Sequence, residues 1–225
     1  MNFELSEEQK MIQQSVERFV QENYDLPKRV EISSKDPGYS KEYWGSMAEL
    51  GWLGLPFEEK DGGFGGNQID TLVIMEQFGK GLVLEPFIAN VVLGGGAIQI
   101  GGSEELKKEM LPGLIEGSKQ MTLAYAEQQS RFDLEDVATS ARQEGDKFII
   151  NGQKSMVLNA ESADHIVVVT RTSGGQVDEE GITLFLVDSN AKGIELQNFP
   201  TVDGLRASEI TFDNVEVSSE RMIGE

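Results

Sequence analysis

The spacing of apolar residues changes near residue 118, and this change limits the chain to a fold in which a helical part precedes a β-sheet part. Before it, apolar residues such as Ile12 and Val16 recur at intervals that place them on one face of a helix. After it, short runs with a period of two are separated by turn signals such as Glu144-Gly145-Asp146. Closely spaced short strands indicate a sandwich or a barrel. The sequence therefore predicts an α+β multidomain protein, with an all-α helical domain over residues 1–118 and an all-β barrel domain over residues 119–225.

Capping residues indicate where the helices begin. Ser6 and Gln9 have the spacing of a capping box, in which each side chain accepts a hydrogen bond from the other residue's amide. Ser40 is expected to begin a second helix that ends at Gly51. The glycines and the proline of residues 55–66 predict a loop. Further helices are expected after Asn67 or Asp70, after Pro86 and after Ser103.

Eight runs in the second half of the chain are expected to be strands. Asn151-Gly152 is interpreted as a turn between the third run and the fourth. The runs are residues 121–126, 137–142, 147–150, 154–157, 166–172, 182–187, 194–199 and 208–217.

The composition excludes several classes of function. The chain has no cysteine, so disulfides, thiolate metal sites and thiol nucleophiles are excluded. Its formal net charge of -20 repels nucleic acid and anionic lipid. The first residues do not form a signal peptide, and no apolar run is long enough to cross a membrane. We therefore expect a cytoplasmic protein with no nucleic-acid partner, no membrane partner and no metal site.

Four segments resemble motifs of the acyl-CoA dehydrogenase family. Leu55-Pro56 with Gly62 to Gly66 is similar to the family's L-P-E-E-x-G-G-x-G loop. Leu123 to Asp133 lies where the family has A-x-T-E-P-x-A-G-S-D, and Phe148 to Asp164 is similar to N-G-x-K-x-W-I-T-N-G-x-x-A-D. Gly204 to Gly224 is similar to G-x-R-x-S followed by F-x-x-V-x-V-P and L-G. The motifs appear in the family's order, with the change from helical to strand spacing between them, and the resemblance extends over the whole chain.

The resemblance implies a function and a set of partners. Family members have a helical N-terminal domain, a middle β-barrel and a C-terminal four-helix domain that usually carries a glutamate base. They are FAD-dependent oxidoreductases that remove hydrogen from the α and β carbons of an acyl-CoA thioester. Electrons pass to an electron-transfer flavoprotein, and the full-length proteins are homo- or hetero-tetramers. This chain corresponds to the first two domains, as a fragment or a naturally short protein, so we expect it to contain no catalytic base and to be inactive alone.

The matched motifs also imply which residues would meet the ligands. Arg131 and Phe132 correspond to positions near the substrate. The cofactor-binding positions implied by the resemblance are Leu123, Tyr125, Ala126, Phe132, Met156, Val157 and Leu158. The Glu127-to-Asp133 variant of this motif is similar to that of a bacterial branch linked to pimeloyl-type acyl-CoA substrates.

Five residues depart from the family's pattern in the two flavin segments. Ala126 replaces the threonine of T-E-P, Gln128 its proline and Phe132 the serine of G-S-D. Met156 replaces the tryptophan of W-I-T, and Leu158 its hydroxyl residue. Three side-chain hydrogen-bond donors are therefore lost, each of which typically contributes about 0.5–1.5 kcal/mol. Met156 and Phe132 can still pack on a flavin ring. Two hypotheses follow: an altered flavin site, or a non-catalytic, flavin-less partner or scaffold subunit.

Several other polar residues are interpreted as structural. His165, the single histidine, is expected at a strand end and Glu127 in a structural contact. Arg206 is expected in a salt bridge of the barrel. Asp133 and Asp136 are expected to cap or solvate their loop rather than bind a metal.

Overall fold

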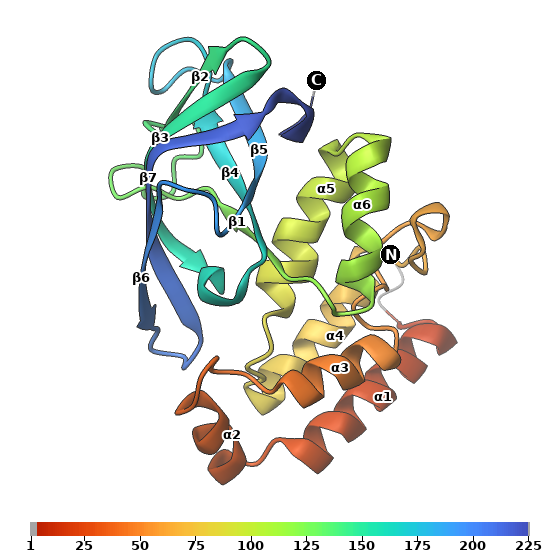
Figure 1. Cartoon of the computed structure of the whole chain (residues 1–225). Helices are drawn as coiled ribbons and strands as arrows, with labels where there is room; N and C mark the ends of the chain where they lie inside the picture. The colour runs from red at the N-terminus through yellow and green to blue at the C-terminus, as the bar shows by residue number, and fades with distance from the viewer. Residues whose placement is uncertain (1–3, 225) are drawn as a thin grey trace. The chain divides into compact units, whose positions relative to one another are not determined.

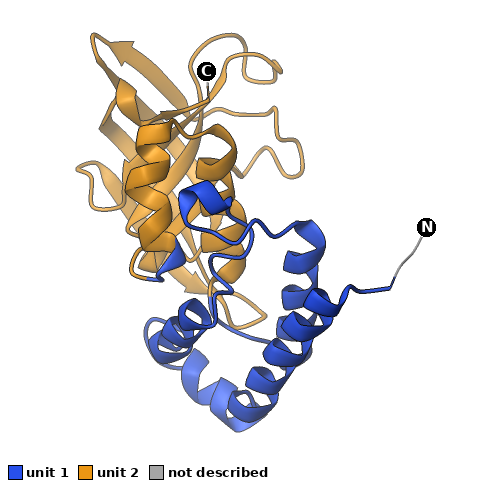
Figure 2. Cartoon of the chain, turned by 90° about the vertical axis from the view of Figure 1, so that its right-hand side faces the viewer, with its two compact units in different colours: residues 1–85, 115–117 blue, residues 86–114, 118–225 orange. Residues whose placement is uncertain are grey.

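The structure is a computed structural model that describes residues 4–224. The chain divides into two compact units (Figure 2). Unit 1 comprises residues 1–85 and 115–117, and unit 2 comprises residues 86–114 and 118–225. Most of the last helical segment before the sheet therefore groups with the sheet. The predicted domain boundary between residues 118 and 119 stays a prediction. It is placed by the change from helical to strand spacing, whereas the two compact units are defined by which residues lie close together in space.

Unit 1 contains the first helices of the chain (Figure 1). They are α1 (Glu7–Asn23), α2 (Leu26–Ser33), α3 (Lys41–Glu49), the short 3-10 helix η1 (Glu59–Asp61) and α4 (Gln68–Gly81). The capping box is confirmed: Gln9 N donates to Ser6 Oγ over 3.1 Å, and Ser6 N donates to Gln9 Oε1 over 3.0 Å. Ser40 caps α3, as the sequence predicts, and Asn67, one of the two residues proposed from the sequence as a cap, caps α4.

Helix α2 is not expected from the sequence. Its eight residues are too few for an apolar period to show, but Asp25 Oδ1 accepts a hydrogen bond from Lys28 N over 2.7 Å and Pro27 lies in the first turn. Residues 55–66 form the predicted loop, interrupted by η1. Helix α2 can therefore be recognised in the sequence from its capping residues, but not from the spacing of its apolar residues.

The helices of unit 2 are η2 (Ile88–Gly95), α5 (Gly96–Gly101) and all but the last residue of α6 (Glu104–Ile115), of which η2 is a π-helix. Met121 N donates to Asn90 Oδ1 over 2.6 Å. A Cβ atom on Gly94 would lie 2.8 Å from Met121 Cγ, so only glycine permits this approach. These contacts fix η2 against the first strand. None of the helices within residues 4–224 is long and apolar enough to cross a membrane.

In the described part of the chain, eight strands form one sheet with the order β6-β7-β3-β2-β4-β5-β8, and β1 pairs with β4 in parallel. The other pairs are antiparallel except for a single parallel contact between β2 and β4. The strands are β1 (Met121–Ala124), β2 (Ser140–Glu144), β3 (Lys147–Leu158), β4 (His165–Arg171), β5 (Ile182–Asp188), β6 (Ile194–Pro200), β7 (Arg206–Ser218) and β8 (Met222–Ile223), with the 3-10 helices η3 (Ala160–Ser162) and η4 (Ser219–Arg221) between them.

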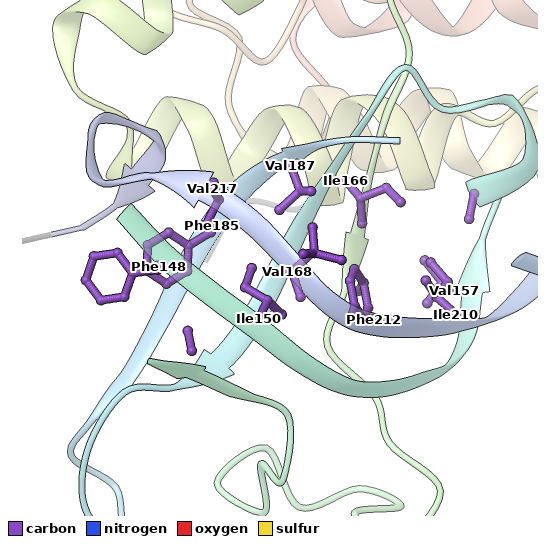
Figure 3. Packing of buried hydrophobic residues seen from close by; sticks show 14 residues of the cluster. Phe148, Ile150, Val157, Ile166, Val168, Phe185, Val187, Ile210, Phe212 and Val217 are labelled. Carbon is purple, nitrogen blue, oxygen red and sulfur yellow. The ribbon is translucent and has the colours of Figure 1, made fainter. Parts of the chain in front are cut away.

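Buried side chains of β1, β2, β3, β4, β5 and β7 form one hydrophobic core (Figure 3). Partly buried residues of β6 and β8 pack against it. Phe148 and Phe185 contact each other with ring centroids 4.7 Å apart, and Ile150, Val168 and Phe212 belong to the same cluster. One core for one sheet requires the sheet to curl around it, which is the barrel-like arrangement expected from the alternating pattern. The prediction of a helical part followed by a β part is confirmed.

One turn predicted from the sequence is wrong. Asn151-Gly152 does not separate two strands, because β3 runs without interruption through both residues. The register between β3 and β7 shifts between Ile150 and Gly152, and shifts again between Lys154 and Val157. At the first shift Asn151 alone lies opposite Asp213 and Asn214, so the extra residue of this β-bulge is on β7, and Asn151-Gly152 continues the strand opposite it.

Candidate functional site

The two segments that the sequence assigns to the cofactor lie side by side in unit 2. Ser155 N donates to Ala126 O over 2.8 Å, which joins the backbone after β1 to β3. Thr122 Oγ1 donates to Leu158 O over 2.6 Å, further along the same two segments. Segments 123–132 and 156–158 are therefore brought together by hydrogen bonds between residues that are distant in the chain.

A buried ion pair fixes this junction. Lys154 Nζ donates to Glu127 Oε1 over 2.6 Å and to Tyr125 O over 3.2 Å, and both charged side chains are almost fully buried. The second carboxylate oxygen of Glu127 accepts from Ala138 N and from Gln129 Nε2, over 2.9 Å and 2.8 Å. A buried charge is stable only when it is paired and hydrogen-bonded, and both conditions are met here.

Electrostatics keep Glu127 ionised. Burial by itself raises the pKa of this carboxyl, but the hydrogen bonds from Lys154, Gln129 and Thr139 and the charge of Lys154 outweigh burial, and the pKa falls to about 2. Glu127 therefore has the structural role that the sequence indicates, and it is not a proton donor at neutral pH.

The implied cofactor residues differ in what they present. Tyr125 is 43% exposed and Met156 is 51% exposed. Ala126 and Leu158 are half-buried, as is Leu123 on β1. Each of these residues leaves at least some surface for a ligand to contact. The hydrogen bonds place the backbone of Tyr125 and Ala126 next to Lys154 and Ser155, directly before Met156. They place Leu158 next to Thr122, directly before Leu123.

Val157 does not present its side chain. It is 2% exposed and belongs to the core inside the sheet. Since successive residues of a strand point to opposite faces, a strand that presents Leu158 buries Val157. Any contact of this residue with a ligand on the outer surface is limited to its backbone.

Arg131 and Phe132 lie in the loop that follows the junction. Phe132 is fully exposed, and Arg131 is exposed with a φ of 50°. This left-handed conformation favours glycine, which is the residue of the G-S-D motif at this position. Asp133 Oδ1 accepts from Glu135 N over 3.0 Å, so this aspartate stabilises the loop, as the sequence indicates.

Arg171 organises this loop, although no motif in the sequence points to it. Its side chain is buried, and its guanidinium donates to the carbonyl oxygens of Glu135, Gln176, Asp178 and Glu180 over 2.7–2.9 Å. These contacts join residues 172–181 to the loop before β2. The sequence carries one signal for this role, an arginine that ends an apolar strand and precedes a glycine-rich loop. That signal is informative only to a reader who expects the cation to be buried.

The junction has the composition of a surface that packs on a flat, apolar ring. Tyr125 and Met156 are exposed apolar side chains on adjacent segments, and a ring can lie against an aromatic or a thioether side chain. The positions of Ala126, Phe132 and Leu158 offer no hydroxyl group. The surface can therefore supply packing to a ring, but these three positions cannot supply the side-chain hydrogen bonds of the family's motif.

Comparison with known proteins assigns the family. Residues 6–118 match the family model described as acyl-CoA dehydrogenase, N-terminal domain, and residues 122–215 match the one described as acyl-CoA dehydrogenase, middle domain. The chain belongs to the acyl-CoA dehydrogenase family. Acyl-CoA dehydrogenases are generally FAD-binding oxidoreductases of fatty acid metabolism.

Individual relatives agree with this assignment. The short-chain specific acyl-CoA dehydrogenase of Clostridium acetobutylicum is 30% identical over 232 residues, which cover 100% of this chain and 60% of the relative. The CarC subunit of the caffeyl-CoA reductase-Etf complex of Acetobacterium woodii is 27% identical, over 98% of this chain and 59% of that subunit. The crystal structure of the acyl-CoA dehydrogenase from Geobacillus kaustophilus superposes with a TM-score of 0.87 at 25% identity, over 100% of this chain and 60% of that one. The chain thus spans about 60% of the length of these acyl-CoA dehydrogenases.

Proposed function

We propose that this chain forms the N-terminal and middle parts of a cytoplasmic, FAD-dependent acyl-CoA dehydrogenase that oxidises the α,β-bond of an acyl-CoA thioester. The observation that carries the proposal is the junction of residues 123–132 with residues 156–158, since both segments match the family's flavin motifs. The junction would form one wall of the flavin site. The remaining walls and the catalytic base would come from outside these 225 residues.

The residues of the junction would bind and orient the cofactor rather than move protons. Tyr125 and Met156 would pack on the ring and exclude water from it, and the backbone next to Ala126 and Leu158 would supply hydrogen bonds. The bound flavin would supply the acceptor for the hydride that leaves the β-carbon of the substrate. Arg131, exposed in the loop, would attract the negatively charged end of the acyl-CoA, and Phe132 would contact its apolar part.

Partners follow from the relatives. One relative is named as a subunit of a complex with an Etf protein, which supports an electron-transfer flavoprotein as the electron acceptor here. A homo- or hetero-tetramer of the full-length protein would be consistent with the complexes formed by fold relatives such as ChsE4-ChsE5 from Mycobacterium tuberculosis.

Restoring lost hydroxyl groups tests the proposal. In the longest natural form of the protein, Leu158→Thr combined with Phe132→Ser is expected to tighten FAD binding by about 1–3 kcal/mol, because each restored hydrogen bond contributes about 0.5–1.5 kcal/mol. FAD titration followed by flavin absorbance measures the change. Ser218→Ala on β7, far along the sheet from the junction, is the matched control and should leave affinity unchanged. Unchanged or weaker binding in the double variant would mean that these positions do not face the flavin.

A second function is motivated by the same substitutions. Ala126, Phe132 and Leu158 remove three donors at once, a pattern that also fits a flavin-less subunit acting as a partner or scaffold. The purified natural protein distinguishes the two. A yellow protein with bound flavin supports the dehydrogenase, whereas a colourless protein that stays colourless after incubation with excess FAD supports the scaffold.

A further inference from the structure

The bulge in β3 next to the candidate flavin surface has a single residue opposite it. Lys154 pairs with Ile210 and Val157 pairs with Ser208, so the two residues Ser155 and Met156 lie opposite Glu209 alone. Two residues facing one define a β-bulge, and such bulges are frequent next to active sites because they redirect a side chain. Here the redirected side chain is that of Met156.

The carboxylate of Glu209 occupies the place of the missing ladder partner. Ser155 Oγ donates to Glu209 Oε2 over 2.7 Å, and Met156 N donates to Glu209 Oε1 over 3.3 Å. Each carboxylate oxygen thus accepts from a different residue of the bulge. The amide of a bulged residue otherwise lacks a partner on the neighbouring strand, and an acceptor supplied by a side chain replaces it.

The conformation that Glu209 supports is unfavourable without such contacts. Met156 has a φ of 54°, in the left-handed region that a methionine rarely adopts. Its side chain is half-exposed, so burial of the side chain does not fix the conformation. The backbone of the bulge is instead fixed from two sides, by Glu209 and by the hydrogen bond from Ser155 N to Ala126 O.

We infer that Glu209 is a positioning residue for the flavin surface: its carboxylate fixes the bulge at Ser155 and Met156 and so presents the Met156 side chain to the cofactor. The inference rests on the proposed function, because it assigns Met156 to the flavin. It adds to the flavin site a residue on β7, outside both of the segments that match the family's flavin motifs.

The test is a graded series at one position with two independent readouts. Glu209→Gln keeps one oxygen acceptor and Glu209→Ala keeps none. Glu216→Gln, on the same strand but paired with Lys147 over 2.7 Å at the surface, is the matched control. Amide hydrogen exchange of the segment that contains Met156 reports on the bulge without any cofactor. The dissociation constant of FAD for the longest natural form of the protein reports on positioning.

Amide exchange at Met156 is expected to be faster in Glu209→Gln than in the wild type, and faster still in Glu209→Ala. Exchange elsewhere in the sheet is expected to stay unchanged. The FAD dissociation constant is expected to rise about threefold to tenfold for Glu209→Gln, the range that corresponds to one lost hydrogen bond. The control should change neither quantity.

Unchanged exchange at Met156 would overturn the inference, and so would faster exchange with unaltered FAD affinity. A wild-type protein that binds no FAD would instead overturn the proposed function, while the exchange result would still show whether Glu209 fixes the bulge. If Glu209→Ala does not fold, the Gln variant alone decides both readouts.

Discussion

The ion pair between Glu127 and Lys154 joins the two cofactor segments. Burial strengthens the attraction between the two charges, and it also makes either charge destabilising once its partner is removed. Lys154→Met is expected to destabilise the protein by about 3–5 kcal/mol, because it leaves a buried carboxylate without its cation. Lys147→Met removes an exposed pair with Glu216 and should change stability by about 1 kcal/mol or less. Urea unfolding at pH 7 measures both. Equal effects of the two substitutions would contradict the assignment.

The same pair predicts a dependence of stability on pH. The pKa of Glu127 falls from an ordinary 4.5 to about 2 in the folded chain. A lowered pKa of an acid stabilises the folded state above the unfolded value, and this contribution is lost as pH falls from 4.5 toward 2. The difference in unfolding free energy between wild type and Lys154→Met, measured from pH 7 to pH 3, should therefore shrink as the pH falls, and a constant difference would refute the assignment.

Strand β3 carries most of the candidate site, and two bulges interrupt its pairing with β7, the first with its extra residue on β7 and the second with its extra residue on β3. At the first bulge, Gly152 has a φ of 149°, and a Cβ atom there would lie 2.6 Å from Thr139 Cα. Gly152→Ala is expected to cost about 2 kcal/mol or more, since both the conformation and the space require glycine. Gly145→Ala separates the two causes, because Gly145 has a φ of 66° but no atom within 4 Å of its Cβ position. Thermal unfolding should rank Gly152→Ala as the more damaging change, and the reverse order would show that the bulge is not tightly packed.

For the whole molecule, the question is how much of an acyl-CoA dehydrogenase these 225 residues reproduce. The chain covers about 60% of its relatives' length, and the candidate surface would enclose one side of a flavin. A half-enclosed ligand loses much of its burial and many hydrogen bonds. We therefore expect the pure 225-residue chain to be colourless, to bind FAD weakly and to reduce no acceptor dye with any acyl-CoA. A full-length acyl-CoA dehydrogenase assayed in parallel is the control, and dye reduction or tight FAD binding by the chain would disprove the expectation.

Features that depend on neighbours a few residues away can be predicted from the sequence alone. The caps at Ser6, Ser40 and Asn67 are predictable because a cap is a hydrogen bond between residues two or three positions apart. The succession of a helical part and a β part follows from the period of apolar residues for the same reason. The motif positions also indicate which segments to compare with the family's flavin site.

Which side chains of those segments are available to a ligand depends on contacts that form when the chain folds. Asn151-Gly152 continues a strand because β7, some sixty residues later, pairs with β3 on both sides of it, and no local signal distinguishes a bulge from a turn. Val157 is in the core and Met156 is at the surface because the bulge at Ser155 and Met156 determines which side chains of β3 point into the core. Glu209 and Arg171 act on residues that are distant in the chain or on backbone carbonyls, which leave no residue pattern in the sequence. Local hydrogen bonds and periods are encoded in adjacent residues, whereas register and burial depend on strands that meet only after the chain has folded.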